Sequence, residues 1–433
     1  MRHSKGSPVV IWIYNILITL LAPIWVPLVW HRSKRRNESP NWQERFGNFK
    51  IELDRKRPVV WVHTVSVGEV IAAAPMLKEL KSLWPEVQVV LSVTTSSGHQ
   101  IARERKDAGE LFDHLVYFPI DVVRFMAAAM LKVKPCAVAI VETELWFNFL
   151  TMAKNFRATT LLVNARISDR SYGRSRWVKF FYESVFDQVD RVLAQTPIDA
   201  ERLAFLGAKN VEVAGNTKFD EPEKNDQDAR QKVRAKFGIT DEELLVVVGS
   251  TRSELEEHCV VDALAGCGIE NLKVVHAPRH LETVERLDST VRTKFDSVGK
   301  WSQRQAAKYL ILDTYGELAD AYAGADLAIV GGGFDNLGGQ NIIQPLAAGI
   351  PTLHGKYMQN FRSAADQAIK QGASRRCDGE LELRAAITEL LSNPEMRSQM
   401  STAGKELVAQ NRGASKRIAE AIIQEGKAAF KPS

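Results

Sequence analysis

The sequence is poor in cysteine and lacks the cysteine spacings that known sites require. Its four cysteines, Cys136, Cys259, Cys267 and Cys377, form neither a Cys-x-x-Cys pair nor a zinc spacing. This absence excludes a metal site built from paired cysteines. It indicates reduced thiols, as in a cytosolic protein.

A large excess of charge of one sign is also missing. The formal net charge is +5 over 433 residues, of which 25% are charged and 45% hydrophobic. Such a composition is typical of a globular protein, and so small a basic excess gives no support for a nucleic-acid partner. A chain of this length is too long for one ordinary hydrophobic core, which predicts two domains.

Several motifs of nucleotide and metal sites are absent. No P-loop and no Gly-x-Gly-x-x-Gly sequence occurs, which gives no support for a P-loop NTPase or a dinucleotide-binding fold. The sequence Asp226-Gln227-Asp228 matches a metal-binding Asp-x-Asp, but it follows no strand and lies in the charged run 220–231. We interpret that run as a solvated linker at a domain boundary, and no metal ion is expected.

One long apolar run is present, at residues 8–30. It is long enough to cross about 30 Å of hydrocarbon, and no signal-peptidase site follows it. Basic residues at positions 32, 34, 35 and 36 place the rest of the chain on the cytoplasmic side. Because Pro23 and Pro27 interrupt the run, an interfacial or re-entrant helix is the alternative to a membrane span.

The rest of the chain alternates apolar strands with helices. Runs such as 59–62, 135–141 and 244–248 are each followed by a polar or small-residue turn and then by a helical pattern. This alternation predicts an α/β protein with parallel sheets and crossover helices. The pattern occurs in two similar halves, which suggests two domains that face each other across a ligand-binding cleft.

The stretch from Pro58 to Trp84 organises the first half. An apolar strand ends in Ser66-Val67-Gly68, and a helical period begins at Glu69. Ligands of open α/β sheets bind outside the carboxyl ends of strands, so Glu69 lies where a carboxylate can act on a reacting group. The alternative is that Glu69 only complements the helix dipole.

Phosphate-binding groups are expected at other strand ends. Lys218 and Arg279 each follow a strand, and the glycine-rich turns 331–333 and 338–339 offer backbone donors before a helix. These groups would neutralise a departing nucleotide phosphate, while a carboxylate would take a proton from an acceptor hydroxyl. The set favours transfer of a sugar from a nucleotide.

Together these motifs resemble one family, the 3-deoxy-D-manno-octulosonic acid (Kdo) transferases of lipopolysaccharide synthesis. The resemblance extends from the N-terminal apolar run almost to the C-terminus. It rests on VHTVSVGE (62–69), VETELW (141–146), NARISDRS (164–171), GNTKFD (215–220), PRH (278–280), GGxF (331–334), GGQN (338–341) and NF (360–361). Several motifs in the same order are far more specific than any one of them.

The resemblance implies a GT-B glycosyltransferase, with two Rossmann-like domains and the active site in the cleft between them. It implies a membrane anchor with a basic flank at 1–36, an acceptor-binding domain at 37–220 and a donor-binding domain with C-terminal helices at 221–433. The implied reaction moves Kdo from CMP-Kdo to a lipid A precursor (lipid IVA), with inversion and release of CMP. The implied location is the cytoplasmic face of the cell inner membrane, whose lipid is a further partner.

The resemblance also implies roles for particular residues. Glu69 matches the family's general base, and Glu142 and Lys218 match residues that stabilise the transition state. The CMP contacts fall on Pro278, Arg279, Tyr315, Gly316, Glu317, Gly338, Gly339, Asn341, Ile342, Ile343 and Gln344. No cofactor is implied, and a metal is less necessary because CMP leaves as a monophosphate.

The sequence departs from the family pattern in the donor half. Gln340 and Gln344 stand where the family has His and Glu, and Gly333 replaces a Ser; in the first half, Phe147 replaces a Pro. Without the charge of a Glu at position 344, donor binding is expected to weaken by about 1–2 kcal/mol. Two alternatives therefore stay open: a GT-B transferase that uses a UDP-sugar, and a membrane-tethered protein without turnover.

Overall fold

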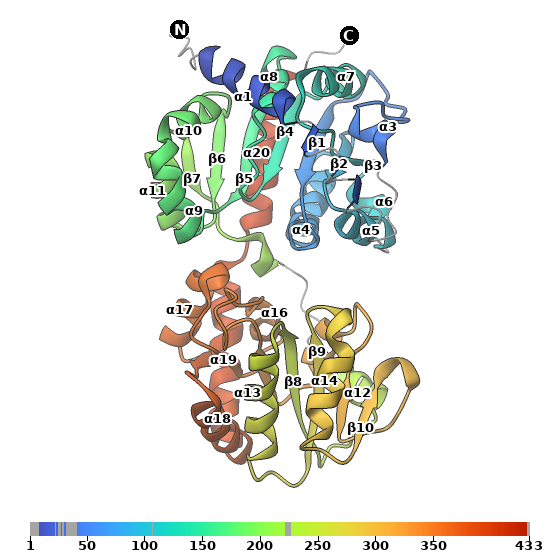
Figure 1. Ribbon diagram of the computed structural model, residues 1–433, viewed down its shortest axis with the longest axis vertical. Coiled ribbons are helices and arrows are strands. Elements are labelled where there is room, and N and C mark those ends of the chain that lie inside the picture. Colours follow the sequence, from blue (N-terminus) through green and yellow to red (C-terminus); the bar gives the residue numbers. More distant parts are fainter. Residues whose placement is uncertain are drawn as a thin grey trace. The chain divides into compact units, whose positions relative to one another are not determined.

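The computed structural model describes residues 8–21, 23–24, 27, 30–31, 41–105, 107–220 and 227–430. The chain divides into two compact units, one formed by Met1–Glu221 with Arg412–Ser433 and the other by Pro222–Asn411. Each unit contains one sheet with helices packed against it (Figure 1). The prediction of two parallel-sheet α/β domains is confirmed.

The first unit contains a seven-stranded sheet of order β3-β2-β1-β4-β5-β6-β7, in which all neighbours are parallel. Its strands are β1 (Val59–Thr64), β2 (Gln88–Val93), β3 (His114–Tyr117), β4 (Ala137–Val141), β5 (Thr159–Ala165), β6 (Arg191–Ala194) and β7 (Val211–Val213). Its helices are α1 (Pro8–Leu20), α3 (Trp42–Arg45), α4 (Val67–Leu83), α5 (Ser96–Glu104), α6 (Ala108–Leu111), α7 (Val123–Val133), α8 (Phe147–Asn155), α9 (Asp169–Ser175), α10 (Lys179–Phe186) and α11 (Pro197–Phe205). The central strands β1 and β4 are buried at every residue, as their unbroken apolar runs predict.

The second unit contains another seven-stranded parallel sheet, of order β10-β11-β9-β8-β12-β13-β14. Its strands are β8 (Leu244–Thr251), β9 (Leu272–Pro278), β10 (Val298–Lys300), β11 (Tyr309–Ile311), β12 (Leu327–Val330), β13 (Thr352–His354) and β14 (Ser374–Arg376). Its helices are α12 (Gln227–Lys236), α13 (Glu254–Ala265), α14 (Val284–Arg292), α15 (Leu318–Gly324), α16 (Ile343–Ala347), α17 (Arg362–Lys370), α18 (Glu380–Ser392) and α19 (Pro394–Asn411). Apart from one edge strand in each sheet, β7 and β10, the two strand orders correspond. The carboxyl end of β8 is therefore the counterpart of the carboxyl end of β1.

The last helix, α20 (Ala414–Ala429), belongs to the first unit, although the expected donor domain had included it. Its Ile418 and Ile422 are fully buried in the core cluster that also contains Trp84 at the end of α4. The carboxylate of Asp220 accepts hydrogen bonds from the backbone N–H groups of Gly413 and Ser415, both at 2.6 Å. The chain therefore returns to the first unit after residue 411.

The N-terminal helix α1 packs against the first unit through one face. The Tyr14 hydroxyl donates to the buried Asp121 carboxylate at 2.6 Å, and the Asn15 and Asn148 side chains bond to each other. Among the described residues, no helix combines the length and the apolar character needed to cross a membrane. The predicted basic flank at 32–36 lies outside the described residues, and so does Asp226, the first aspartate of the Asp-x-Asp sequence.

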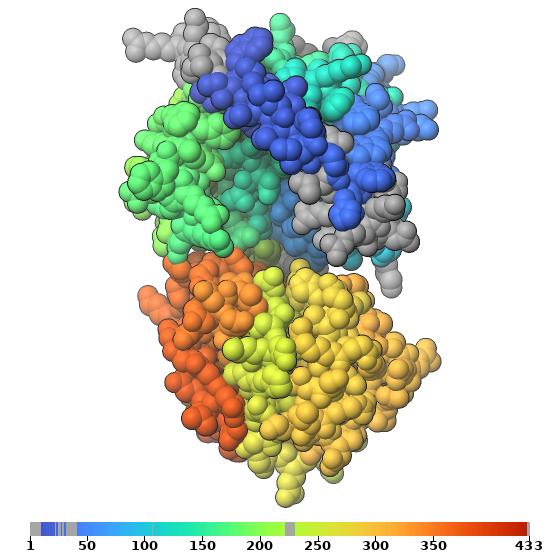
Figure 2. Space-filling view, viewed as in Figure 1, coloured from blue at the N-terminus to red at the C-terminus, as the bar shows by residue number. Residues whose placement is uncertain are grey.

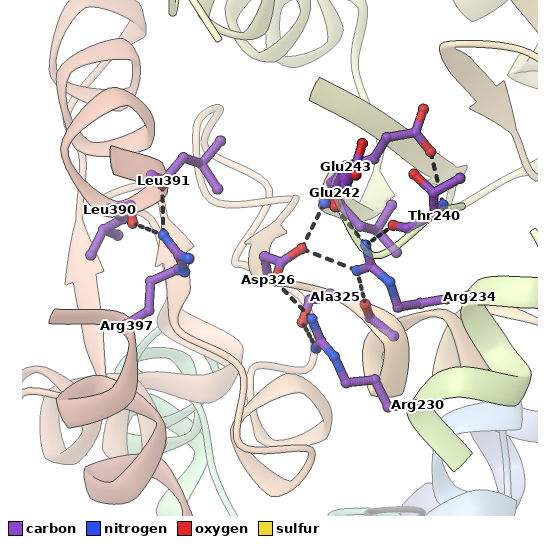
Figure 3. Close-up of polar contacts among 12 residues, drawn as sticks. Arg230, Arg234, Thr240, Glu242, Glu243, Ala325, Asp326, Leu390, Leu391 and Arg397 are labelled. Carbon is purple, nitrogen blue, oxygen red and sulfur yellow. Dashed lines mark hydrogen bonds and ion pairs between the residues drawn. The ribbon is translucent and has the colours of Figure 1, made fainter. Parts of the chain in front are cut away.

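An ion network centred on Asp326 and the buried Arg234 links elements of the second unit (Figure 3). The Asp326 carboxylate, just before β12, accepts hydrogen bonds from Arg230 at 2.8 Å, from Arg234 at 3.2 Å and from the backbone N–H of Leu245 at 2.8 Å. Arg234 is buried and also donates to three backbone carbonyls. The network ties α12 to two central strands, β8 and β12.

Replacing Asp326 by Ala is expected to destabilise the second unit by about 3–5 kcal/mol, because the Arg234 guanidinium would stay buried without its counter-ion. Urea denaturation measures the loss, and faster hydrogen exchange in the β8 and β12 peptides locates it. Asp378→Ala is the matched control, since Asp378 pairs with Arg376 in an exposed ion pair. Equal stability of Asp326→Ala and Asp378→Ala would contradict the expectation.

Candidate active site

Glu69 lies in the first turn of α4, at the carboxyl end of the central strand β1. Its carboxylate accepts hydrogen bonds from the backbone N–H of Val65 at 2.7 Å and from the Ser66 hydroxyl at 3.1 Å. Glu69 is the third residue of the helix after the N-cap Ser66, and its carboxylate reaches back to the residue before the N-cap. The first-turn position is also the one that the helix-dipole alternative requires. The two hydrogen bonds fix the orientation of the carboxylate.

The environment of Glu69 also gives its carboxylate an unusual proton affinity. The side chain is 8% exposed, and burial together with the nearby charges of Glu142 and Glu144 raises its pKa to about 7. The hydrogen bonds from Val65 and Ser66 act in the opposite direction without cancelling the rise. A carboxylate with a pKa near neutral can accept a proton at physiological pH and hold it.

Glu142 follows β4 and is held by two cations. Its Oε2 accepts from Arg166 Nε at 2.7 Å, and its Oε1 accepts from Lys218 Nζ at 3.1 Å. Burial raises the pKa of Glu142, but the charges of Lys218 and Arg166 outweigh burial, so that the net shift is downward. Glu142 has a φ of +64°, a left-handed conformation that is costly for a residue other than glycine.

The first unit thus gathers three predicted residues at the carboxyl edge of its sheet. Glu69 follows β1, Glu142 follows β4, and Lys218 follows β7. Asn164 at the end of β5 supports this arrangement, because its Oδ1 accepts from the backbone N–H of Thr217 at 3.1 Å. Arg166, which completes the charge cluster, was missed as a site residue; its place directly after a strand in NARISDRS was the available signal.

The predicted CMP contacts lie in the second unit, at the end of β9, after β11 and after β12. Pro278 is buried, whereas the Arg279 side chain is exposed and its backbone N–H bonds to the Thr251 carbonyl at 2.8 Å. The Tyr315 side chain is exposed, and Gly316 has a φ of +108°. The Oε2 atom of Glu317 is buried and has no hydrogen-bond partner in the described structure. Such an oxygen can accept a hydrogen bond from a ligand.

The predicted contacts at 338–344 form a tight loop that enters α16. A Cβ atom on Gly338 would lie 2.4 Å from the Asn360 side-chain amide, so any larger residue would clash at this position. Asn341 accepts the backbone N–H of Ile343 at 3.0 Å, and Gln344 is half-buried. Ile342 and Ile343 are buried, so their side chains serve the core and only their backbone atoms can meet a nucleotide.

The glycine-rich turn 331–333 is not a free phosphate cradle. The buried Glu256 carboxylate accepts hydrogen bonds from the backbone N–H groups of Gly332 and Phe334, and from that of Arg252 at 2.9 Å. Glu256 occupies in α13 the position that Glu69 has in α4, three residues after a serine N-cap. These amides are therefore already engaged by a carboxylate, which does not agree with the prediction that this turn offers free donors to a phosphate.

The predicted site residues thus form two sets, one in each unit. The predicted cleft between the units stays a prediction, as do the assigned roles. Within the described ranges, no three His, Cys, Asp or Glu side chains cluster closely enough to hold a metal ion.

Comparisons with known proteins identify relatives over most of the chain. The sequence profile described as 3-deoxy-D-manno-octulosonic-acid transferase (kdotransferase) matches residues 40–221. The chain is 32% identical to the 3-deoxy-D-manno-octulosonic acid transferase of Chlamydophila psittaci over 82% of each protein. It is 30% identical to the one of Bordetella pertussis over 95% of this chain and 98% of the other. A solved glycosyltransferase from Rickettsia africae shares the fold, with a TM-score of 0.60 at 11% identity over 87% of this chain and 100% of that one.

Proposed function

Because the chain belongs to the 3-deoxy-D-manno-octulosonic acid (Kdo) transferases, glycosyltransferases of lipopolysaccharide core synthesis, we propose that it transfers Kdo from CMP-Kdo to a sugar hydroxyl of a lipid A precursor such as lipid IVA. The configuration at the anomeric carbon inverts, and CMP is released. The observation that carries the proposal is the buried Glu69, with its raised pKa, beside the ionised cluster of Glu142, Arg166 and Lys218.

In the proposed reaction Glu69 accepts the proton of the acceptor hydroxyl as its oxygen bonds to the anomeric carbon. The bond from that carbon to the CMP phosphate oxygen breaks, and its electron pair leaves with CMP. One displacement of this kind inverts the centre. The proton ends on Glu69, whose raised pKa suits it to hold that proton.

Glu142 and Lys218 act on the charges that develop during this displacement. Positive charge grows on the sugar ring and negative charge on the departing phosphate, so a fixed anion and a fixed cation each stabilise the transition state. The ion pair between Glu142 and Lys218 holds both groups in place. Arg279 would bind the phosphate from the donor half, and Tyr315, Glu317 and the 338–344 loop would bind the nucleoside.

The nucleotide is tested by thermal shift. CMP is expected to raise the melting temperature more than UDP does at equal concentration. Gln344→Glu is expected to tighten CMP binding by about 1–2 kcal/mol, roughly tenfold, because a charged acceptor is restored. Stabilisation by UDP alone would favour the UDP-sugar alternative instead.

Turnover is tested by mass spectrometry of the lipid acceptor after incubation with CMP-Kdo. A mass gain with the intact protein, and none with Glu69→Ala, is the expected result. No mass gain with either protein, while CMP still binds, would favour the tethered protein without turnover.

The same proposal places the protein at the cytoplasmic face of the inner membrane, attached through residues 1–36. The apolar run at 8–30 supports this location, and so does the outward face of α1. That face exposes Trp12, Ile13, Ile16, Leu17 and Leu20, each by about half or more. An acceptor whose acyl chains stay in the bilayer is met more often by an enzyme held at the same surface.

Arg166 is expected to act as a positioning residue for Glu142. Arg166→Ala should raise the pKa of the buried Glu142 carboxyl and lower kcat by about 10–100-fold, with a steeper loss of rate at acid pH. Initial rates across pH, with and without added guanidinium, measure this effect, and guanidinium should restore part of the rate. Arg202→Ala, which breaks the ion pair with Asp169 in the same unit, is the control. An unchanged pH profile in Arg166→Ala would contradict the role.

A further inference from the structure

A second apolar surface lies beside α1, where α9 passes into α10. We define the basic aromatic corner as residues 170–180. Its Trp177 side chain is 88% exposed and its Phe180 side chain 63% exposed. Large apolar side chains in water are unfavourable, and a cluster of them marks an interaction surface.

The corner extends into α10, which is in contact with α1 in the first unit. The Tyr14 ring of α1 packs against Phe181 of α10 with ring centroids 6.1 Å apart. Figure 2 shows the dark blue α1 beside the green segment that contains α9 and α10. The outward face of α1 is itself apolar, with Trp12 69% exposed. The two exposed apolar groups thus come from neighbouring elements of the same unit.

The corner also carries unbalanced positive charge. Arg170, Arg174 and Arg176 are exposed, and none of the three has a carboxylate partner among the described residues. The acidic side chains next to them are neutralised, because Asp169 pairs with Arg202 at 2.7 Å and Glu183 pairs with Lys179 at 3.4 Å. Exposed aromatic rings flanked by arginines are the composition of a surface that meets anionic lipid headgroups.

We infer that the basic aromatic corner is a second membrane contact, which places Trp177 and Phe180 in the headgroup region of an anionic bilayer. A second copy of the chain is a less favourable partner. In a two-fold contact through this surface, the arginines without a carboxylate partner would face the same arginines of the other copy, and like charges repel. The inference extends the membrane attachment proposed above to a part of the chain outside residues 1–36. Binding to vesicles without substrate tests it separately from the transferase function.

The test is cosedimentation of the full-length protein with vesicles. One set contains phosphatidylglycerol and phosphatidylethanolamine, and the other contains phosphatidylcholine alone. The double variant Trp177→Ser/Phe180→Ser is expected to bind the anionic vesicles about tenfold less tightly, with an unchanged melting temperature. The triple variant Arg170→Gln/Arg174→Gln/Arg176→Gln should lose about tenfold to a hundredfold on anionic vesicles and nothing on phosphatidylcholine.

The matched control is Leu255→Ser/Leu381→Ser, which removes two apolar side chains of the second unit that are 63% and 75% exposed and should leave binding unchanged. Quenching of tryptophan fluorescence by brominated lipid should weaken in Trp177→Phe. Equal vesicle binding by the wild type and the Trp177/Phe180 variant would overturn the inference. A wild-type dimer that this variant converts to a monomer, with vesicle binding intact, would also overturn it and make the corner an interface between copies.

Discussion

Replacement of Glu69 by Gln is expected to lower kcat for Kdo transfer by about 10²–10⁴-fold, because an amide cannot take the proton of the acceptor hydroxyl. The amide oxygen can still accept the backbone N–H of Val65, so this contact at the start of α4 is kept. Initial rates with saturating CMP-Kdo and acceptor measure the loss. Glu79→Gln, at the other end of the same helix, is the control.

The pH dependence of the rate should identify the same group. Since burial raises the pKa of Glu69 to about 7, the wild-type rate is expected to rise with pH through about 7, as the carboxylate forms. The residual rate of Glu69→Gln should lack this rise. A variant that kept more than about a tenth of kcat, or the same acid limb, would contradict the role of Glu69 as the base.

Stability should change in the opposite direction to activity. The pKa of Glu69 in the folded protein lies above its unfolded value, so ionisation of this carboxyl costs folding free energy as pH rises from the unfolded value to about 7. Glu69→Gln removes that cost. The variant is therefore expected to melt at a higher temperature than the wild type at pH 8, and at nearly the same temperature at about pH 4. A lower melting temperature at pH 8 would mean that the hydrogen bonds of the carboxylate with Val65 and Ser66 are its main contribution to stability.

Replacement of Lys218 by Met is the second change with a large expected effect, a loss of about 10²–10³-fold in kcat. The departing phosphate loses a fixed cation, and the Glu142 carboxylate keeps its ion pair with Arg166. The pKa of Glu142 should rise, because burial is then opposed by less positive charge. Initial rates across pH measure both consequences.

Controls for Lys218 come from the same unit. Lys154→Met removes a lysine that pairs with Asp190 at the other edge of the sheet and should leave kcat unchanged. Lys218→Arg should recover part of the rate, because the charge is kept. If Glu142 and Lys218 act as one pair, the double variant Glu142→Gln/Lys218→Met should be no slower than the worse single variant. Fully additive losses would mean that the two residues act independently.

The sequence predicted the interior of both sheets because their strands are unbroken apolar runs. Strands such as β1 and β12 are buried at every residue, and their composition is enough to place them. The edge strands β10 and β14 were missed, since each has three residues and no apolar run. The exposed Arg375 and Arg376 of β14 resemble loop residues in the sequence. Pairing with a neighbouring strand, which composition does not report, makes them strands.

The candidate site was predictable where a residue follows a strand and matches a family motif. Glu69, Glu142 and Lys218 are of this kind. Arg166 also follows a strand within a family motif, but its ion pair with Glu142 could not be read from the sequence, because the two residues are far apart along the chain. The contact of Glu256 with Phe334 was not predictable for the same reason. The donor amides of the glycine-rich turn looked free in the sequence, whereas a buried carboxylate uses them in the structure.

The return of α20 to the first unit has a consequence for biosynthesis. The second unit is one continuous segment of the chain, so it can fold while translation is still in progress. The first unit cannot finish its core until α20 has left the ribosome, because Ile418 and Ile422 of α20 belong to one of its hydrophobic core clusters. The first unit is therefore synthesised first but completes its core last. Until then its apolar core residues stay exposed, and chaperones or other unfolded chains can bind them.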